Sequence, residues 1–141
     1  MTERAHVIYA RETALDAAEF RRVLVESGLG SARPVEDFSR LQAMLSGANL
    51  VVTARLDDPL HRLVGVVRGV SDGCWCCYLS ELAVSASAQG LGVGKGLLDE
   101  AQRQLGPAVA LMLVSVPEAA GFYERAGMDR LADAFWYHRT Q

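Results

Sequence analysis

Residues 88–98, AQGLGVGKGLL, carry the first pattern with chemical meaning, because glycines occupy alternate positions directly before an aliphatic helical stripe. A turn that opens a helix exposes backbone N–H groups at the positive end of the helix dipole. Glycine lets an anion approach these groups, since no Cβ stands in the way. The pattern therefore predicts a binding site for an anion, above all for a phosphate group.

Two common phosphate-binding motifs do not fit this stretch. The Walker A motif needs glycine five residues before its Gly-Lys pair and Ser or Thr after the lysine, whereas this chain has Gln89 and Gly96 there. The dinucleotide fingerprint G-x-G-x-x-G fails as well, because its third glycine would fall on Lys95 or Leu97. A glycine-rich turn that serves only helix–sheet packing stays open as an alternative.

The cysteines and histidines do not form a metal-binding pattern. Cys74, Cys76 and Cys77 make one cluster without the second pair that zinc needs, and the three histidines are scattered. We expect buried strand cysteines, with a cysteine that lines an acceptor pocket as the alternative. Neighbours in a strand point to opposite faces, so Cys76 and Cys77 cannot easily share a site. The odd number of cysteines argues against a disulfide framework and favours a reducing compartment.

Composition limits the class of protein. The 141 residues are 50% hydrophobic and 22% charged, as in an ordinary globular protein, and predict one domain over 1–141. The net charge of −3 argues against a nucleic-acid partner. No stretch reaches the ~18 apolar residues that span a bilayer. The charged start MTERAHVIYARE lacks an apolar signal core, so we expect a cytoplasmic protein without membrane contact.

The N-terminal half predicts a strand, two helices and a strand meander. Residues 6–10 form a short apolar strand, and Thr13 is the expected N-cap of a helix that ends at Gly28. Pro34 is expected to open a second helix, which Gly47 closes. β-Branched and aromatic residues with short turns between them then predict an antiparallel meander of three strands, over 49–56, 62–70 and 74–84.

The C-terminal half alternates helices and strands. A helix that begins near Gly92 is followed by the apolar run 108–116, which is expected to be a strand buried on both faces and parallel to 74–84. Pro117 starts a short helix, and 134–139 is expected as a last strand. The order β-α-α-β-β-β-α-β-α-β predicts an α/β fold with a mixed (α+β) sheet.

Three stretches resemble one protein family. Gln89-Gly90-Leu91-Gly92-Val93-Gly94 matches Gln/Arg-x-x-Gly-x-Gly/Ala and resembles the acyl-CoA pyrophosphate loop of the GNAT superfamily of N-acetyltransferases. YLSELAV (78–84) looks like the family's fourth strand, and GFYERAGM (121–128) looks like its second signature. The resemblance is sharp over residues 62–128 and only topological before them. It implies the GNAT-type acyl-CoA N-acyltransferase fold.

The resemblance also implies a binding site for acetyl-CoA as co-substrate. The pantetheine arm would lie against the backbone of a bulged fourth strand, and the pyrophosphate would lie on the loop. Lys95 could contact a phosphate group as a point charge, and a solvated lysine at a helix start is the alternative. The residues expected to bind acetyl-CoA are Leu82, Ala83, Val84, Gln89, Gly90, Leu91, Gly92, Val93, Gly94, Lys95 and Phe122.

Two residues receive candidate catalytic roles from the resemblance. Tyr123 maps onto the family's general acid, since a phenol with a pKa near ~10 can protonate a departing thiolate; a core tyrosine is the alternative. Glu81 lies where many relatives carry an acidic residue, and it is either the general base or a strand-face carboxylate in a structural hydrogen bond. At Val116, where some relatives carry asparagine, that contact is absent or replaced.

The implied function is transfer of an acetyl group from acetyl-CoA to a primary amine of a small molecule or peptide, by direct attack in a ternary complex and without metal. A catalytically silent acyl-CoA-binding sensor or partner module of the same fold is the alternative. A homodimer is expected, because dimers are frequent among relatives. Trp75, Tyr78 and the aromatic cluster 135–138 are expected in core or dimer packing, with a substrate wall as the alternative.

Overall fold

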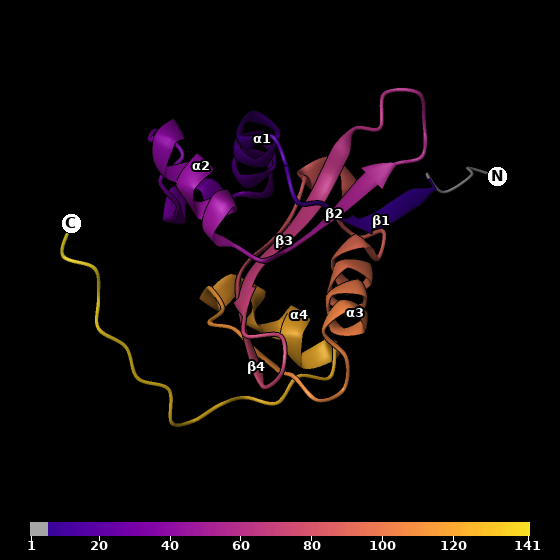
Figure 1. The fold of residues 1–141 in the computed structure, drawn as a ribbon. Coiled ribbons are helices and arrows are strands. Elements are labelled where there is room, and N and C mark those ends of the chain that lie inside the picture. The colour runs from indigo at the N-terminus through magenta and orange to yellow at the C-terminus, as the bar shows by residue number, and fades with distance from the viewer. Residues whose placement is uncertain (1–5) are drawn as a thin grey trace.

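The computed structural model describes residues 6–141, which form one five-stranded sheet in the order β1-β2-β3-β4-β5 (Figure 1). The first four strands pair antiparallel with their neighbours, and the fifth pairs parallel with the fourth. This confirms the predicted meander, the parallel pair across a helical crossover and the mixed sheet. The strands are β1 (Val7–Arg11), β2 (Leu50–Leu56), β3 (Leu63–Ser71), β4 (Cys76–Val84) and β5 (Ala110–Met112).

Helices lie on both faces of this sheet and enclose two separate apolar cores (Figure 1). One core joins the sheet to α1 (Ala17–Ser27) and α2 (Phe38–Gly47), with Phe20, Leu24 and Leu41 fully buried. The other joins it to α3 (Val93–Leu105), whose buried residues Leu97, Leu98 and Ala101 belong to the predicted stripe. The remaining elements are η1 (Leu29–Ala32), η2 (Ala86–Ala88), η3 (Pro117–Ala119) and α4 (Ala120–Arg125).

Two predicted helix starts are wrong, because aspartates further along the chain provide better caps. The side chain of Asp16, not Thr13, accepts the backbone N–H of Ala18 and opens α1. The Asp37 side chain caps α2 by accepting the N–H of Arg40, so this helix begins at Phe38, four residues after Pro34. The predicted end of the first helix at Gly28 is confirmed by its left-handed backbone, with φ of 88°.

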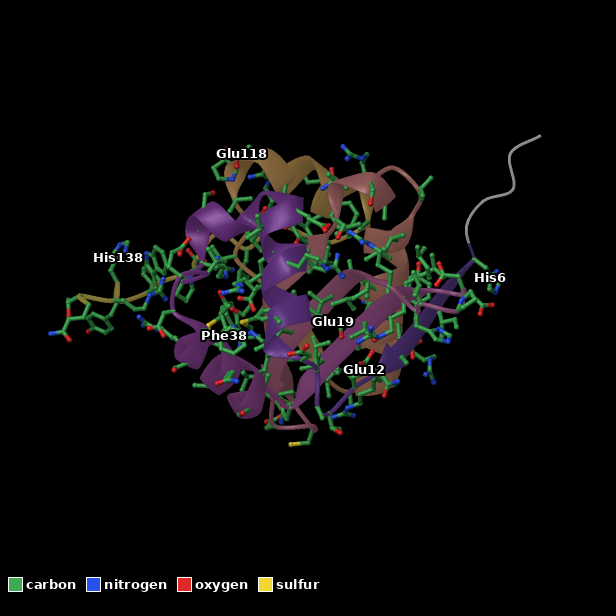
Figure 2. The ribbon with its side chains drawn as sticks, turned by 90° about the horizontal axis from the view of Figure 1, so that it is seen from above. His6, Glu12, Glu19, Phe38, Glu118 and His138 are labelled. Carbon is green, nitrogen blue, oxygen red and sulfur yellow. The ribbon has the colours of Figure 1, made fainter. Side chains whose placement is uncertain are left out.

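The predictions for the last two strands are also wrong. Only Ala110–Met112 of the run 108–116 pairs with β4, and these residues are partly or fully exposed instead of buried on both faces. Residues 134–139 form no strand, so the observed order ends with α4. Within residues 6–141 the second edge of β5 has no partner strand. Figure 2 shows His138 on this C-terminal segment, away from the body of the molecule.

The expectation of three buried strand cysteines is correct only for Cys77. Cys74 and Cys76 are exposed, since the turn between β3 and β4 extends to the start of β4. The Asp72 carboxylate holds this turn by accepting three backbone N–H groups, those of residues 74, 75 and 76, and these bonds lower the pKa of Asp72 to about 2.

No helix in the part of the chain that the structure describes is long and apolar enough to cross a membrane. The cytoplasmic prediction rests partly on the charged start of the chain. Residues 1–5 of that start lie outside the described residues.

Candidate functional site

A β-bulge at Ser80 determines which side chains of β4 face which core. Arg68 of β3 pairs with Glu81, but the next residue, Gly69, pairs with Leu79, so Ser80 is an extra residue in β4. The bulge reverses the alternation of faces: Leu79 packs in the core on the α3 side, whereas Glu81 points to the α1–α2 side. The bulge expected from the family resemblance is therefore present, without a glycine to mark it.

Glu81 is the centre of a buried ion-pair cluster. Its side chain has no exposed surface and contacts the guanidinium groups of Arg68 and Arg33, the latter at 2.8 Å. The Ser80 hydroxyl donates to the same carboxylate at 2.6 Å. Burial raises the pKa of Glu81, but the hydrogen bonds from Arg68 and Ser80 and the nearby arginine charges outweigh it, so the net pKa is lowered.

Arg33 connects this cluster to the rest of the site. It lies in the segment between η1 and α2 and also donates to the carbonyl oxygen of Ser80 at 2.6 Å. Burial raises the pKa of Tyr123, and the positive charge of Arg33 offsets part of this rise. The sequence analysis predicted no role for Arg33 or Arg68. The only signal was Arg68 itself, a lone arginine within the β-branched run of β3.

Tyr123 lies in α4 next to Phe122, with the two ring centroids 5.0 Å apart in an edge-to-face arrangement. Burial raises its pKa, so the phenol stays protonated at neutral pH. Its hydroxyl makes no hydrogen bond to any of residues 6–141. The hydroxyl can therefore bond to solvent or to a ligand, and the core-tyrosine alternative stays open.

The glycine stretch leaves a series of backbone N–H groups without acceptors. Gly92 caps α3 without a side-chain hydrogen bond, and the first helical bond runs from the N–H of Gly96 to the Gly92 carbonyl at 3.0 Å. No N–H group of residues 90–95 donates to an acceptor in the described part of the chain. Gly90 and Gly92 both have φ of +81°, and the space where a Cβ would stand is open at each.

The next two glycines of the stretch are required by packing. A Cβ on Gly94 would come within 3.1 Å of the Phe122 ring and 3.7 Å of Leu82. A Cβ on Gly96 would overlap the ring and hydroxyl of Tyr9. The two interpretations of the stretch, ligand binding and helix–sheet packing, therefore apply to different glycines. Gly90 and Gly92 leave room for a ligand, whereas the glycines at 94 and 96 allow close helix packing.

The other residues of the predicted loop differ in their contacts and exposure. Gln89 donates its side-chain amide to the Val84 carbonyl at 2.9 Å and so closes the loop on the end of β4. Lys95 pairs with Asp99 one turn along α3 and stays half-exposed. Leu91 is 48% exposed, whereas Val93 is buried in the α3-side core.

β4 and β5 separate before they reach this loop. Their pairing ends at Tyr78, so the edge of β4 from residue 79 onward has no partner strand among the described residues. The N–H of Ser85 donates to Val64 in β3 at 2.8 Å, and N–H groups alternate sides along a strand. By this alternation the N–H groups of Leu82 and Val84 face the open edge, and that of Ala83 faces β3.

The arrangement can hold an extended, anionic acyl-thioester. The open β4 edge supplies hydrogen-bond donors to an extended chain, the N–H series at the start of α3 suits a pyrophosphate, and Tyr123 offers an unengaged phenol. Val116, at the start of η3, has no polar side chain to add. No group of metal-ligating side chains occurs within residues 6–141.

A mixed sheet whose parallel strands β4 and β5 separate beside a helix start with open N–H groups is the architecture of acyl-CoA N-acetyltransferases. The chain matches the family model described as "Acetyltransferase (GNAT) domain" over residues 26–135. It therefore belongs to the GNAT acetyltransferase family, and the family predicted from the sequence is confirmed.

Individual relatives agree with this assignment. The N-acetyltransferase ycf52 of Porphyra purpurea, itself uncharacterized, is 26% identical over 107 residues, which cover 71% of this chain and 62% of that protein. The chain thus spans less than two thirds of this relative. A crystal structure of a Deinococcus radiodurans protein assigned as an acetyltransferase is 27% identical, with a TM-score of 0.75 over 99% of this chain and 94% of that one.

An aminoglycoside N-acetyltransferase solved in complex with CoA shares the fold, with a TM-score of 0.71 over 100% of this chain and 99% of that one. Its sequence identity is 15%, so this likeness concerns the fold alone.

Proposed function

We propose that this chain is an acetyl-CoA-dependent N-acetyltransferase that acetylates a primary amine of a small molecule or peptide. The observation that carries the proposal is the unpartnered N–H series of residues 90–95, at the start of α3 and directly after the open edge of β4. A series of this kind suits a pyrophosphate, and the open edge suits an amide-containing arm. The CoA complex of a structural neighbour supports the choice of ligand.

The proposed reaction is direct attack in a ternary complex. The neutral amine attacks the thioester carbonyl, a C–N bond forms and the C–S bond breaks. The N–H of Leu82 or Val84 stabilises the negative charge that develops on the carbonyl oxygen. Tyr123 donates its phenolic proton to the departing thiolate, and the amine proton passes to water. Holding both substrates side by side provides much of the acceleration.

Glu81 contributes to this reaction by position. All contacts of its carboxylate are to cationic or hydroxyl donors, and its pKa is lowered, which makes it a weak proton acceptor. We propose that it fixes Arg33 between β4 and Tyr123 and that the general base is a water molecule. The direct base role of Glu81 stays a prediction that these contacts do not favour.

The first experiment measures acetyl-CoA binding and CoA release separately. We expect acetyl-CoA to raise Tm by several degrees, since a ligand at about 100 times its Kd stabilises by ~2.7 kcal/mol. Release of free thiol is then followed across simple amines, polyamines, aminoglycosides, amino acids and peptides. Activity with at least one acceptor that is lost in Tyr123→Phe supports the enzyme. Binding without release for any acceptor favours the silent acyl-CoA-binding module, and the absence of binding refutes both.

We also propose three further features from the sequence alone, namely one domain over residues 1–141, a cytoplasmic location and a homodimer.

A further inference from the structure

The ion-pair cluster below the β4 bulge carries one excess positive charge. Arg68 and Arg33 share the single carboxylate of Glu81, and no second carboxylate within residues 6–141 pairs with either arginine. Arg68 donates to this carboxylate twice, and Arg33 and Ser80 donate to it once each. An ionised carboxylate has about four acceptor positions, so none is left. Since an excess charge away from water is costly, the cluster favours one more anion beside it.

Arg33 is the member of the cluster that presents this charge. Its side chain is 22% exposed, against 10% for Arg68 and none for Glu81. Its Nε donates to Glu81, its Nη1 to the Ala32 carbonyl at 2.9 Å and its Nη2 to the Ser80 carbonyl at 2.6 Å. Each Nη carries a second N–H group, and neither of these has an acceptor within residues 6–141. Two donors on neighbouring nitrogens match the two oxygens of a carboxylate.

Arg33 lies beside the place where an acceptor would meet the thioester. Its bonds to Ser80 and Glu81 fix it to β4 directly before Leu82, whose N–H faces the open edge of the strand. It is also close enough to Tyr123 for its charge to offset part of the rise in the pKa of that phenol. Because Glu81 points to the α1–α2 side of the sheet, Arg33 approaches the reacting atoms from that side.

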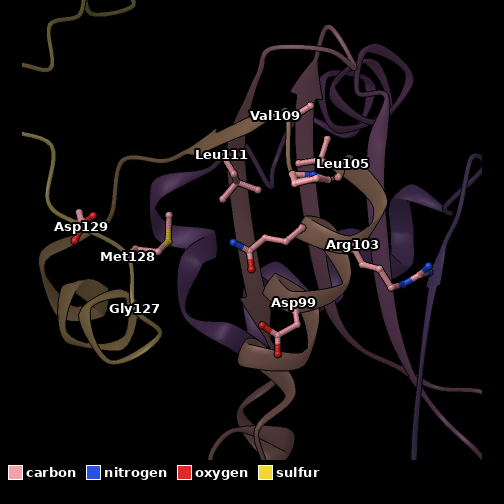
Figure 3. Close-up of a pocket in the computed structure, with 11 residues that line it drawn as sticks. Asp99, Arg103, Leu105, Val109, Leu111, Gly127, Met128 and Asp129 are labelled. Carbon is pink, nitrogen blue, oxygen red and sulfur yellow. The ribbon is translucent and has the colours of Figure 1, made fainter.

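A cleft beside β5 lies on the opposite face of the sheet. It has a volume of about 860 Å³ and lies between the second half of α3, β5 and the segment after α4 (Figure 3). Two of its charged side chains are already paired along α3, Arg103 with Glu100 and Asp99 with Lys95. The cleft therefore provides no partner for the free donors of Arg33.

We propose that Arg33 binds the carboxylate of the acceptor and that the acceptor is an amino acid. The assignment rests on the proposed acetyl transfer and names the acceptor class for it. A carboxylate carries one negative charge and balances the excess charge of the cluster, whereas a phosphate group of about −1.5 to −2 leaves an excess of the opposite sign. Polyamines and aminoglycosides fit less well, because the excess charge repels their additional ammonium groups and Glu81 has no acceptor position free for them.

The test measures how much the carboxylate of the acceptor contributes. Each common amino acid is compared with its amide and with its decarboxylated amine, both of which keep the primary amine. Release of free thiol from acetyl-CoA gives kcat and KM for every acceptor. Because hydrogen bonds between charged groups are the stronger ones, we expect the KM of the preferred amino acid to be at least about tenfold below that of its amide.

Arg33→Gln tests whether this preference comes from Arg33. The variant keeps the balanced pair of Glu81 with Arg68, so we expect it to fold. We expect KM for the amino acid to rise at least about tenfold, whereas KM for the amide and both kcat values stay near wild type. Arg33→Lys keeps the charge but lacks the planar pair of donors, and we expect it to restore part of the preference.

Arg55→Gln is the matched control. The Arg55 side chain is also 22% exposed, but it pairs with Glu12 and Glu19 instead of Glu81. We expect this variant to keep the wild-type ratio of the KM values for amino acid and amide.

Three results would overturn the assignment. Amides or decarboxylated amines that react as well as the amino acids would show that no carboxylate is bound, and acetyl transfer itself would stand. An Arg33→Gln variant that lowers kcat for amino acid and amide alike, with their KM ratio unchanged, would show that Arg33 acts on the reaction instead. No thiol release with any amine would refute acetyl transfer, and the assignment with it.

Discussion

Replacing Glu81 by glutamine tests the buried ion-pair cluster below the β4 bulge. The carboxylate of Glu81 has no exposed surface and holds the guanidinium groups of Arg33 and Arg68. Glutamine has nearly the same shape, but it leaves the buried Arg68 and the partly exposed Arg33 without a counter-charge. The substitution therefore changes the electrostatics of the cluster and leaves the packing almost unchanged.

The expected loss of stability is large. Removing one partner of a buried ion pair costs about 3–5 kcal/mol, and glutamine retains one acceptor oxygen, so we expect about 3 kcal/mol. This corresponds to a fall in Tm of roughly 10 °C for a chain of this size. Because small domains are stable by about 5–15 kcal/mol, Glu81→Gln still folds at neutral pH.

The dependence of this loss on pH follows from the lowered pKa of Glu81. A carboxylate with a lowered folded-state pKa stabilises the chain fully above its unfolded-state value of 4.5, and this contribution disappears as the pH falls through the folded-state value. The Tm difference between wild type and Glu81→Gln is therefore constant near neutral pH and shrinks below 4.5. Thermal unfolding followed by circular dichroism between acidic and neutral pH measures it.

Glu12→Gln is the matched control. Glu12 also pairs with an arginine, Arg55 at 2.8 Å, but its side chain is 26% exposed and lies near Glu19 (Figure 2). A partly exposed pair contributes about 0–1 kcal/mol, so Glu12→Gln loses much less. Wild-type stability of Glu81→Gln at neutral pH, or a Tm difference that grows as the pH falls, would show that the Glu81 carboxylate does not stabilise the fold as a buried counter-charge.

Three further predictions concern the reaction and the loop. Tyr123→Phe lowers kcat by at least about tenfold and leaves the Kd of acetyl-CoA near wild type, because the lost proton donor acts only on the departing thiolate; equal kcat values would place the acid elsewhere. Since burial raises the pKa of Tyr123, the midpoint of any fall in wild-type kcat from loss of this acid lies above the ordinary tyrosine value of 10.0, and a midpoint below that value that Tyr123→Phe abolishes would contradict it. Gly96→Ala destabilises the chain by about 1 kcal/mol, because the overlap with Tyr9 costs about 2 kcal/mol and the better helix propensity of alanine offsets about 1 kcal/mol of it; in a double-mutant cycle of unfolding free energies Tyr9→Ala relieves most of this loss, and simple additivity would show another cause.

The part of the fold that follows from local chemistry could be predicted from the sequence. β-Branched runs with Asp- and Gly-containing turns gave the meander β2-β3-β4, and the alternate glycines marked the start of α3. Capping was harder to predict, because Asp16 and Asp37 compete with Thr13 and Pro34 for the same helix starts, and each of these residue types is common at a helix start.

The part of the site that depends on register could not be predicted. The cluster of Glu81 with Arg33 and Arg68 exists because Ser80 shifts the faces of β4 by one residue. No glycine or proline marks that shift, and Arg33 is 48 residues away in sequence. The β5 prediction failed for a different reason: an apolar run does not say how many of its residues pair with a neighbouring strand, and only residues 110–112 pair with β4.

The most direct test of the proposed acetyl-CoA site is the Kd of acetyl-CoA, measured by calorimetry, for Gly92→Asp and Gly92→Asn. Both residues tolerate the left-handed backbone at this position and differ by a single charge beside the open N–H groups. A carboxylate about 5 Å from a phosphate charge at an effective dielectric constant of ~20 costs about 3 kcal/mol, or roughly 100-fold in Kd. We expect the Asp variant to bind acetyl-CoA about 100-fold more weakly than the Asn variant, and equal Kd values for the two would mean that the pyrophosphate does not lie at the start of α3.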